Sequence, residues 1–202
     1  MSREGILFIV SGPSGVGKGT VLKEVLKRLD DNVTVSVSVT TRKPREGEVN
    51  GVHYHFISTE EFIKLKETNG MFEYVEALDC GYGTPRKPVE ESIANGRDVI
   101  LEIETIGAQK VREKTDCVSI FIAPPSASEL WRRLTSRGTE DDAQIEKRIE
   151  KCRTELPCMY DYDYVVVNEE LNVCADEVAG IINAERHKVS KNKDLIAKII
   201  KN

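Results

Sequence analysis

The feature of this chain that most constrains its fold is a glycine-rich segment between an apolar run and an amphipathic helix. The apolar run is Ile6–Val10, and the segment after it reads Ser11-Gly-Pro-Ser-Gly-Val-Gly-Lys-Gly-Thr20. Gly12, four further residues, Gly17 and Lys18 give the G-x-x-x-x-G-K spacing of a phosphate-binding loop. Glycines let successive backbone N–H groups turn toward one anion, and the positive end of the next helix points at it. The pattern therefore predicts a strand, a phosphate loop and a helix, in that order.

We expect this loop to bind ATP, with Lys18 placing its charge on the β- and γ-phosphates. The usual motif has Ser or Thr directly after the lysine to ligate Mg²⁺, whereas this chain has Gly19 there and Thr20 one residue later. We therefore expect Mg²⁺, the cofactor of ATP, to be held mainly by nucleotide oxygens and waters, and we name no protein ligand for it. The predicted ATP-binding residues of the loop are Gly12, Pro13, Ser14, Gly15, Val16, Gly17, Lys18, Gly19 and Thr20.

Four apolar runs have the near-continuous character of strands that are buried on both faces. Segments with helical periodicity separate them, and capping-box patterns at Ser58–Glu61 and Ser126–Glu129 predict two helix starts. Strands that alternate with helices indicate an α/β fold with a mainly parallel sheet. The runs are Ile6–Val10, Val99–Ile103, Val118–Ala123 and Tyr164–Val167.

The stretch from about Val33 to Pro88 has a different pattern. Apolar residues from Val33 to Val39 alternate with Ser and Thr, which predicts a strand with one polar face, and shorter strand-like pieces follow at Val52–Ile57 and Phe72–Val75. We interpret this stretch as a small α+β insertion, and the charged stretch near residues 128–156 as predominantly helical and rich in arginine. The predicted division is core 1–35, insertion 36–88, core 89–126, a helical segment 127–157 and core 158–202.

Composition excludes several classes of partner. The formal net charge of −5 argues against a nucleic-acid binder, because neutralising phosphates needs a basic surface. The apolar run near the start is too short to span a bilayer. The five cysteines form no C-x-x-C pair and predict reduced thiols in a cytoplasmic protein. We expect no nucleic-acid or membrane partner, and a monomer or small homo-oligomer.

The predicted insertion carries a long motif, Ser38-Val-Thr-Thr-Arg-Lys-Pro-Arg-Glu-Gly-Glu-Val-Asn-Gly-Val-His-Tyr54. It resembles the signature of the guanylate kinase family, and the match continues through Phe72-Glu73, Tyr82-Gly-Thr-Pro85 and Phe121-Ile-Ala-Pro-Pro125. The resemblance covers nearly the whole chain. It implies a P-loop NTPase core with a parallel sheet flanked by helices, a GMP-binding insertion and a helical lid. The implied activity is ATP-dependent phosphorylation of GMP, and also of dGMP, to the diphosphate.

The resemblance assigns the GMP phosphate to Arg42, Arg45, Tyr54 and Tyr82, and guanidinium forks do match phosphate oxygens. It assigns guanine reading to Ser38, Glu73 and Thr84. Guanine presents N1–H and N2–H₂ as adjacent donors that a carboxylate can accept, whereas adenine lacks both. Glu102 and Glu104 follow the run Val99–Ile103, at the sheet edge where α/β proteins bind ligands. The resemblance also assigns Glu102 to the GMP site. Glu104 departs from the family pattern, which has aspartate at that position.

The resemblance also assigns arginines of the lid to the transferring phosphate, at Arg137 and Arg148. With Lys18 and Arg42 these are the predicted catalytic residues. Arg133 is equally well explained as a salt-bridge residue on a helix face, and Asn168 matches a position near the adenine.

Two other readings of the sequence stay open. A P-loop kinase for another nucleoside monophosphate would keep the same loop, although Glu73 and Ser38 favour guanine. A guanylate-kinase-like interaction module would keep the fold and bind proteins, although such modules typically lose residues of the phosphate loop. The histidines His53 and His55 could be imagined as metal ligands, but without a third ligand we expect structural or surface roles.

Overall fold

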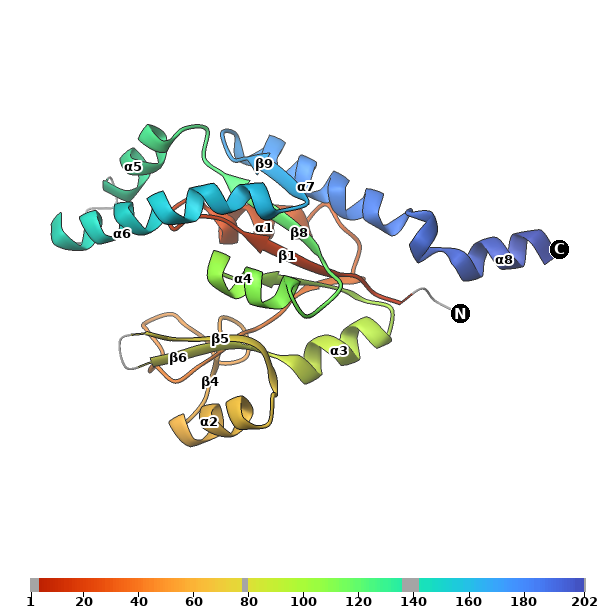
Figure 1. Ribbon diagram of the computed structural model, residues 1–202, viewed down its shortest axis with the longest axis horizontal. Helices are drawn as coiled ribbons and strands as arrows, with labels where there is room; N and C mark the ends of the chain where they lie inside the picture. The colour runs from red at the N-terminus through yellow and green to blue at the C-terminus, as the bar shows by residue number, and fades with distance from the viewer. Residues whose placement is uncertain (1–3, 78–79, 136–141, 202) are drawn as a thin grey trace.

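A five-stranded parallel sheet forms the core of the protein (Figure 1). The computed structural model describes residues 4–77, 80–135 and 142–201. Each of the four apolar runs forms a strand in this sheet, which confirms the predicted α/β fold. The strand order is β2-β7-β1-β8-β9, with β1 Leu7–Ser11, β2 Val33–Val35, β7 Asp98–Glu102, β8 Val118–Ala123 and β9 Tyr164–Val167.

Helices cover both faces of this sheet, which explains why its strands are apolar throughout. Alternate residues of β1 point to opposite sides, and Phe8 packs in the cluster that includes α1 (Lys18–Leu26) and α7 (Leu171–Arg186). Ile9 packs in the other cluster, with residues of α3 (Arg86–Ala94) and α4 (Thr105–Arg112). The phosphate loop leaves β1 at the carboxyl edge of the sheet, and α1 begins at its end.

A second, smaller sheet forms in the stretch predicted as an insertion. Figure 1 shows it beside the core, with α2 on its outer side. The order is β4-β3-β6-β5, in which β3 and β4 are parallel and the other pairs antiparallel. Ser58 and Glu61 form the predicted capping box at the start of α2. The elements are β3 Val39–Thr40, β4 His55–Phe56, α2 Thr59–Glu67, β5 Met71–Ala77 and β6 Cys80–Pro85.

The alternating run from Val33 to Val39 was predicted as one strand, and this was wrong. Its first part, β2, pairs with β7 in the core, and its end, β3, pairs with β6 in the small sheet. Between them, the Ser36 N–H donates to Ile100 O, and Ser38 O accepts from His55 N–H. Residues 36–38 belong to neither strand and carry the chain from one sheet to the other, so the alternation in sequence continues through a change of partner. The predicted piece Val52–Ile57 is a strand only at His55–Phe56.

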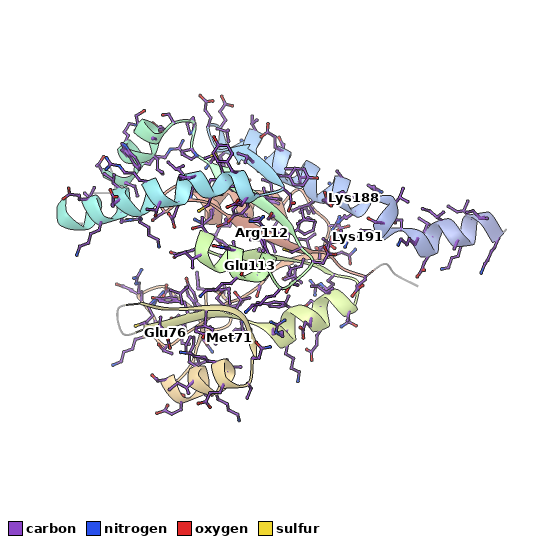
Figure 2. The ribbon with its side chains drawn as sticks, viewed as in Figure 1. Met71, Glu76, Arg112, Glu113, Lys188 and Lys191 are labelled. Carbon is purple, nitrogen blue, oxygen red and sulfur yellow. The ribbon has the colours of Figure 1, made fainter. Side chains whose placement is uncertain are left out.

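Two helices follow β8, and the last helix projects from the body of the molecule. α5 (Ala127–Thr135) begins after Ser126, whose Oγ accepts the Glu129 N–H at 3.1 Å, and α6 (Asp142–Glu155) continues into a 3₁₀ segment at Leu156–Asp161. A 3₁₀ turn at Val189–Lys191 then leads into α8 (Lys193–Lys201). Figure 2 labels Lys188 and Lys191 at this connection, far from Met71 and Glu76 on the small sheet. Within the described ranges, no helix has the length and apolar character needed to cross a membrane.

Candidate active site

The predicted phosphate loop has the backbone that anion binding requires. Gly15 and Gly17 have φ values of 84° and 97°, a left-handed conformation that glycine adopts without strain. The Nζ of Lys18 donates to Gly12 O at 2.7 Å and to Pro13 O at 3.2 Å, so the lysine is folded over its own loop. Burial lowers the pKa of Lys18, and nearby carboxylates, chiefly Glu102, oppose that shift. The loop thus holds a cation and a helix N-terminus at one place.

A cleft of about 800 Å³ opens beside this loop, a volume suited to a nucleotide-sized ligand. Its walls come from the phosphate loop, α1, the crossing between the two sheets, the loop between β3 and β4, the end of β7, and α6. Predicted residues on its walls are Gly12, Ser14, Gly15, Gly17, Lys18, Gly19, Thr20, Ser38, Tyr54, Glu102 and Arg148. Predicted residues that do not line it are Pro13, Val16, Arg42, Arg45, Glu73, Tyr82, Thr84 and Asn168.

Arg42 lies in a cluster just outside the cleft wall. Its two terminal nitrogens each donate to Glu48 at 2.6 Å, and its guanidinium lies 5.2 Å from the centre of the Tyr54 ring. This ion pair lowers the pKa of Glu48 to about 2. The Tyr82 ring packs edge-on against Tyr54 at 6.1 Å. Three of the four predicted phosphate-binding side chains are therefore neighbours.

Arg45 joins this cluster through its backbone N–H, which donates to Glu48 Oε2 at 2.8 Å. The sequence analysis assigned no role to Glu48, which lines the cleft and holds Arg42 in place. A signal was available, because Glu48 lies within the quoted motif, six residues after Arg42.

Glu73 and Thr84 meet where the small sheet faces the core. Thr84 Oγ1 donates to Glu73 Oε1 at 2.8 Å, and Glu73 is only 8% exposed. Burial raises the pKa of Glu73, and the Thr84 bond opposes that shift. A Cβ on Gly107, in α4, would lie 2.8 Å from Glu73 Oε2, so the core approaches the second carboxylate oxygen closely. The Glu73 carboxylate is thus held in one orientation, as hydrogen bonding to the edge of a base would require.

The two carboxylates after β7 have different surroundings. Glu102 faces the start of α1, since a Cβ on Gly19 would lie 3.5 Å from Glu102 Oε1. Glu102 is accessible from the cleft but has protein atoms on several sides, and this desolvation raises its pKa, opposed by Lys18 and Lys23. Glu104 instead forms an ion pair with Lys151 of α6 at 2.8 Å.

The lid residues are only partly described. Arg137 lies outside the described residues. Arg148 reaches the phosphate loop, where its Nη2 donates to Ser14 Oγ at 2.8 Å. Arg133 pairs with Glu129 at 2.8 Å and donates to Asn168 O at 3.1 Å, which agrees with its reading as a salt-bridge residue on a helix face.

Asn168 lies behind the phosphate loop rather than on the cleft wall. It is 8% exposed, and its Nδ2 donates to Val16 O at 2.7 Å. Its predicted contact with adenine stays a prediction, and in the structure it supports the loop backbone.

A second residue of α6, Glu155, also contacts the phosphate loop, and it was not predicted from the sequence. Glu155 is 4% exposed, lines the cleft, and accepts the Ser14 N–H at 3.2 Å. Burial raises its pKa, and Lys151 opposes that shift. The available signal was its spacing, because Glu155 follows Arg148 by seven residues and so lies on the same face of one helix.

Comparisons with known proteins point to one family. The family model for guanylate kinase matches residues 4–185. The guanylate kinase of Clostridioides difficile is 47% identical over 195 residues, covering 96% of this chain and 95% of that protein. That of Latilactobacillus sakei is 47% identical over 201 residues, covering 99% of each. The crystal structure of guanylate kinase from Anaplasma phagocytophilum superimposes with a TM-score of 0.76 at 35% identity, covering 94% of this chain and 90% of that one.

Proposed function

The chain belongs to the guanylate kinase family, and from this premise we propose that it transfers the γ-phosphoryl group of ATP to GMP, giving ADP and GDP. The single observation that carries the proposal is the cleft between the phosphate loop and the loop that joins β3 to β4, in a chain similar to guanylate kinases over its full length. Because the guanine edge is the same in the deoxynucleotide, dGMP is expected as a second acceptor. The reaction would supply GDP for GTP synthesis.

In the proposed reaction, an oxygen of the GMP phosphate attacks the γ-phosphorus of ATP. A P–O bond forms to that oxygen, and the bond from the γ-phosphorus to the β–γ bridging oxygen breaks in line with it, so ADP leaves. The attacking phosphate is mostly dianionic at neutral pH, since its second pKa is about 6, and no general base is needed. Catalysis is then positioning together with neutralisation of charge.

Cations from three parts of the chain would carry out that neutralisation. Lys18 would move from the carbonyls of Gly12 and Pro13 to the β- and γ-phosphates of ATP. Arg148 already contacts the phosphate loop through Ser14 Oγ and would turn to the transferring phosphate. Arg137 is proposed to bind the same phosphate, on the basis of the family pattern. The loop from Gly12 to Thr20 would surround the triphosphate and donate to it through backbone N–H groups such as those of Gly15, Gly17, Lys18, Gly19 and Thr20. Asn168 would border the adenine.

The acceptor would be held by the small sheet. Three N–H groups of Arg42 donate to Glu48 and Lys43. Its guanidinium also contacts Tyr82 and lies against Tyr54, so it would bind the GMP phosphate together with these phenols and Arg45. The guanine donors would meet Glu73, with Ser38, Thr84 and Glu102 as further acceptors or hydroxyls. An acceptor without these donors would leave the buried carboxylate of Glu73 unpaired, which costs several kcal/mol.

Mg²⁺ fits the donor set at the loop only as an ion shared with the nucleotide. Glu102 faces Gly19, where the usual loop has its hydroxyl, and could hold the hydrated ion through a water. When bound, Mg²⁺ would neutralise charge on the β- and γ-phosphates.

The remaining features of the proposal concern the whole chain. We propose that the 36–88 insertion binds GMP, that the 127–157 segment acts as a lid, and that the other segments form the ATP-binding core. The five cysteines are free thiols, which supports a cytoplasmic location. We propose ATP and GMP as partners, no nucleic acid or membrane, and a monomer or small homo-oligomer.

The test is phosphoryl transfer from ATP by the purified protein, measured as formation of the diphosphate of each acceptor, with GMP, AMP, CMP and UMP compared. We expect GMP to be preferred by at least about 10³-fold in kcat/KM. Lys18→Ala should lower kcat/KM for ATP by at least about 10²-fold, because it removes the charge at the transferring group. Preference for another acceptor would favour a different nucleoside monophosphate kinase. Absence of any turnover, with the chain folded, would favour an interaction module.

A further inference from the structure

Each polar group of Ser14 bonds to the same helix, α6. The Ser14 N–H donates to Glu155 Oε2 at 3.2 Å, and the Ser14 Oγ accepts from Arg148 at 2.8 Å. The Ser14 carbonyl accepts the thiol of Cys152, with sulfur and oxygen 3.5 Å apart. Residues 148, 152 and 155 lie four and then three positions apart, so they form one face of the helix. The tip of the phosphate loop is therefore fixed to α6 by three side chains.

Burial of the Glu155 carboxylate at this position costs free energy of desolvation. The carboxylate is almost fully buried, its hydrogen bond to Ser14 is 3.2 Å long, and its ion pair with Lys151 is 3.9 Å long. A buried carboxylate with so few partners stabilises a fold less than an apolar side chain would. Its presence at the rim of the cleft therefore calls for an explanation other than stability.

We propose that Glu155 is a positioning residue for phosphoryl transfer, and this inference rests on the function proposed above. By holding the Ser14 N–H, Glu155 fixes the tip of the loop against α6, so that the loop and the helix that carries Arg148 form one unit. Arg148 is then held at the rim of the ATP site before the nucleotide arrives. The Val16 N–H donates to Pro13 O within the loop, and the N–H groups of Gly15, Gly17 and Lys18 would bind the anion.

A second contact on the same helix face strengthens this unit. Lys151 pairs with Glu104 at 2.8 Å, and Glu104 directly precedes α4 at the carboxyl edge of the sheet. α6 is thus tied both to the loop after β1 and to the loop after β7. Without Glu155, the Lys151 contact would remain but the phosphate loop would lose its acceptor.

The experiment compares four variants by steady-state kinetics for both substrates and by equilibrium binding of ATP, which needs no turnover. Glu155→Ala removes the acceptor, and Glu155→Gln keeps an oxygen that can accept the Ser14 N–H. Ser14→Ala removes only the contact with Arg148. Glu150→Gln is the matched control, because Glu150 lies on the same helix but is exposed and pairs with Arg153.

We expect Glu155→Ala to raise KM and Kd for ATP about 10-fold and to lower kcat about 10-fold, with KM for GMP unchanged. Glu155→Gln should stay within about 3-fold of the wild type. Ser14→Ala should lower kcat more than it changes the affinity for ATP. Thermal unfolding of Glu155→Ala should show a folded protein with an unchanged or raised Tm, because a buried charge has been removed.

Wild-type ATP parameters in folded Glu155→Ala would overturn the proposal. So would an equal rise in KM for GMP, which indicates general loosening, or a Gln variant as impaired as the Ala variant. If the wild type bound ATP but did not phosphorylate GMP, the proposed function would fail, whereas the ATP-binding arm would still test Glu155.

Discussion

Three carboxylates, Glu73, Glu102 and Glu155, have pKa values raised chiefly by desolvation. Each has different neighbours: Glu73 contacts Thr84 and α4, Glu102 faces the start of α1, and Glu155 binds the loop tip. Burial makes a carboxylate selective, because a ligand that does not pair with it leaves a desolvated charge. The buried Glu73 is therefore the residue at which the proposed choice of base is best tested.

Replacement of Glu73 by glutamine tests base selection. The amide nitrogen of Gln would face one of the guanine donors, so a hydrogen bond to a charged acceptor is lost. We expect kcat/KM for GMP to fall about 10- to 100-fold and that for AMP to change much less. Glu76→Gln, on the same strand but exposed and paired with Lys66, is the control and should behave as the wild type (Figure 2). Unchanged discrimination between GMP and AMP would remove Glu73 from the base site.

The raised pKa of Glu73 predicts how its contribution depends on pH. As pH falls through this raised value, the carboxyl binds a proton and can no longer accept both guanine donors, so kcat/KM for GMP should fall at a higher pH than for an ordinary glutamate. The effect on stability has the opposite sign. Because the folded state binds this proton more tightly than the unfolded state, the contribution of Glu73 to the free energy of unfolding increases as the pH falls. Profiles of the wild type and Glu73→Gln from about pH 5 to about pH 8 separate this effect from titration of the GMP phosphate. Identical acid limbs would contradict it.

At the scale of elements, one buried aspartate of β7 connects that strand both to Ile6, just before β1, and to α7. Asp98 is fully buried, accepts the Ile6 N–H at 2.8 Å, and pairs with Arg186 of α7 at 2.7 Å. Arg186 also pairs with the exposed Asp30 at 2.9 Å. One arginine thus joins a buried and an exposed carboxylate, and the two should differ greatly in their effect on stability.

We expect Asp98→Asn to lower the free energy of unfolding by about 2–4 kcal/mol, because the buried pair loses its charge and one acceptor. Asp30→Asn, the matched control, should cost less than about 1 kcal/mol, since exposed ion pairs contribute little. Urea denaturation monitored by circular dichroism measures both. Equal losses for the two variants would show that burial at Asp98 does not determine the strength of this contact.

The elements also show what the sequence could and could not predict. Strands such as β1 were predictable because residues on both faces, Phe8 and Ile9, are buried, and the helix after Ser58 was predictable from its capping box. The break between β2 and β3 was not, because the alternation of apolar and polar residues runs through it while the hydrogen-bonding partner changes from β7 to β6. The roles of Glu48 and Glu155 depend on tertiary contacts, and periodicity alone does not reveal them.

At the scale of the whole molecule, the parallel core and the insertion meet at a common cleft. The core presents the phosphate loop, and the loop between β3 and β4 presents Tyr54, against which Arg42 lies. Glu73 is buried nearby in the insertion, where the small sheet contacts α4. α6 completes the wall through Arg148 and Glu155. A donor and an acceptor bound on the two sides would have their phosphates between these elements, as in-line transfer requires.

The most direct test of this arrangement is a crystal structure of the protein with adenosine and guanosine joined through a chain of phosphates. The account predicts that the phosphates bind the N–H groups from Gly15 to Thr20 and the Lys18 ammonium. It also predicts that the guanine edge lies about 3 Å from the Glu73 carboxylate, with the adjoining phosphate near Arg42 and Tyr54. Guanine bound away from Glu73, or phosphates bound away from the loop, would contradict it.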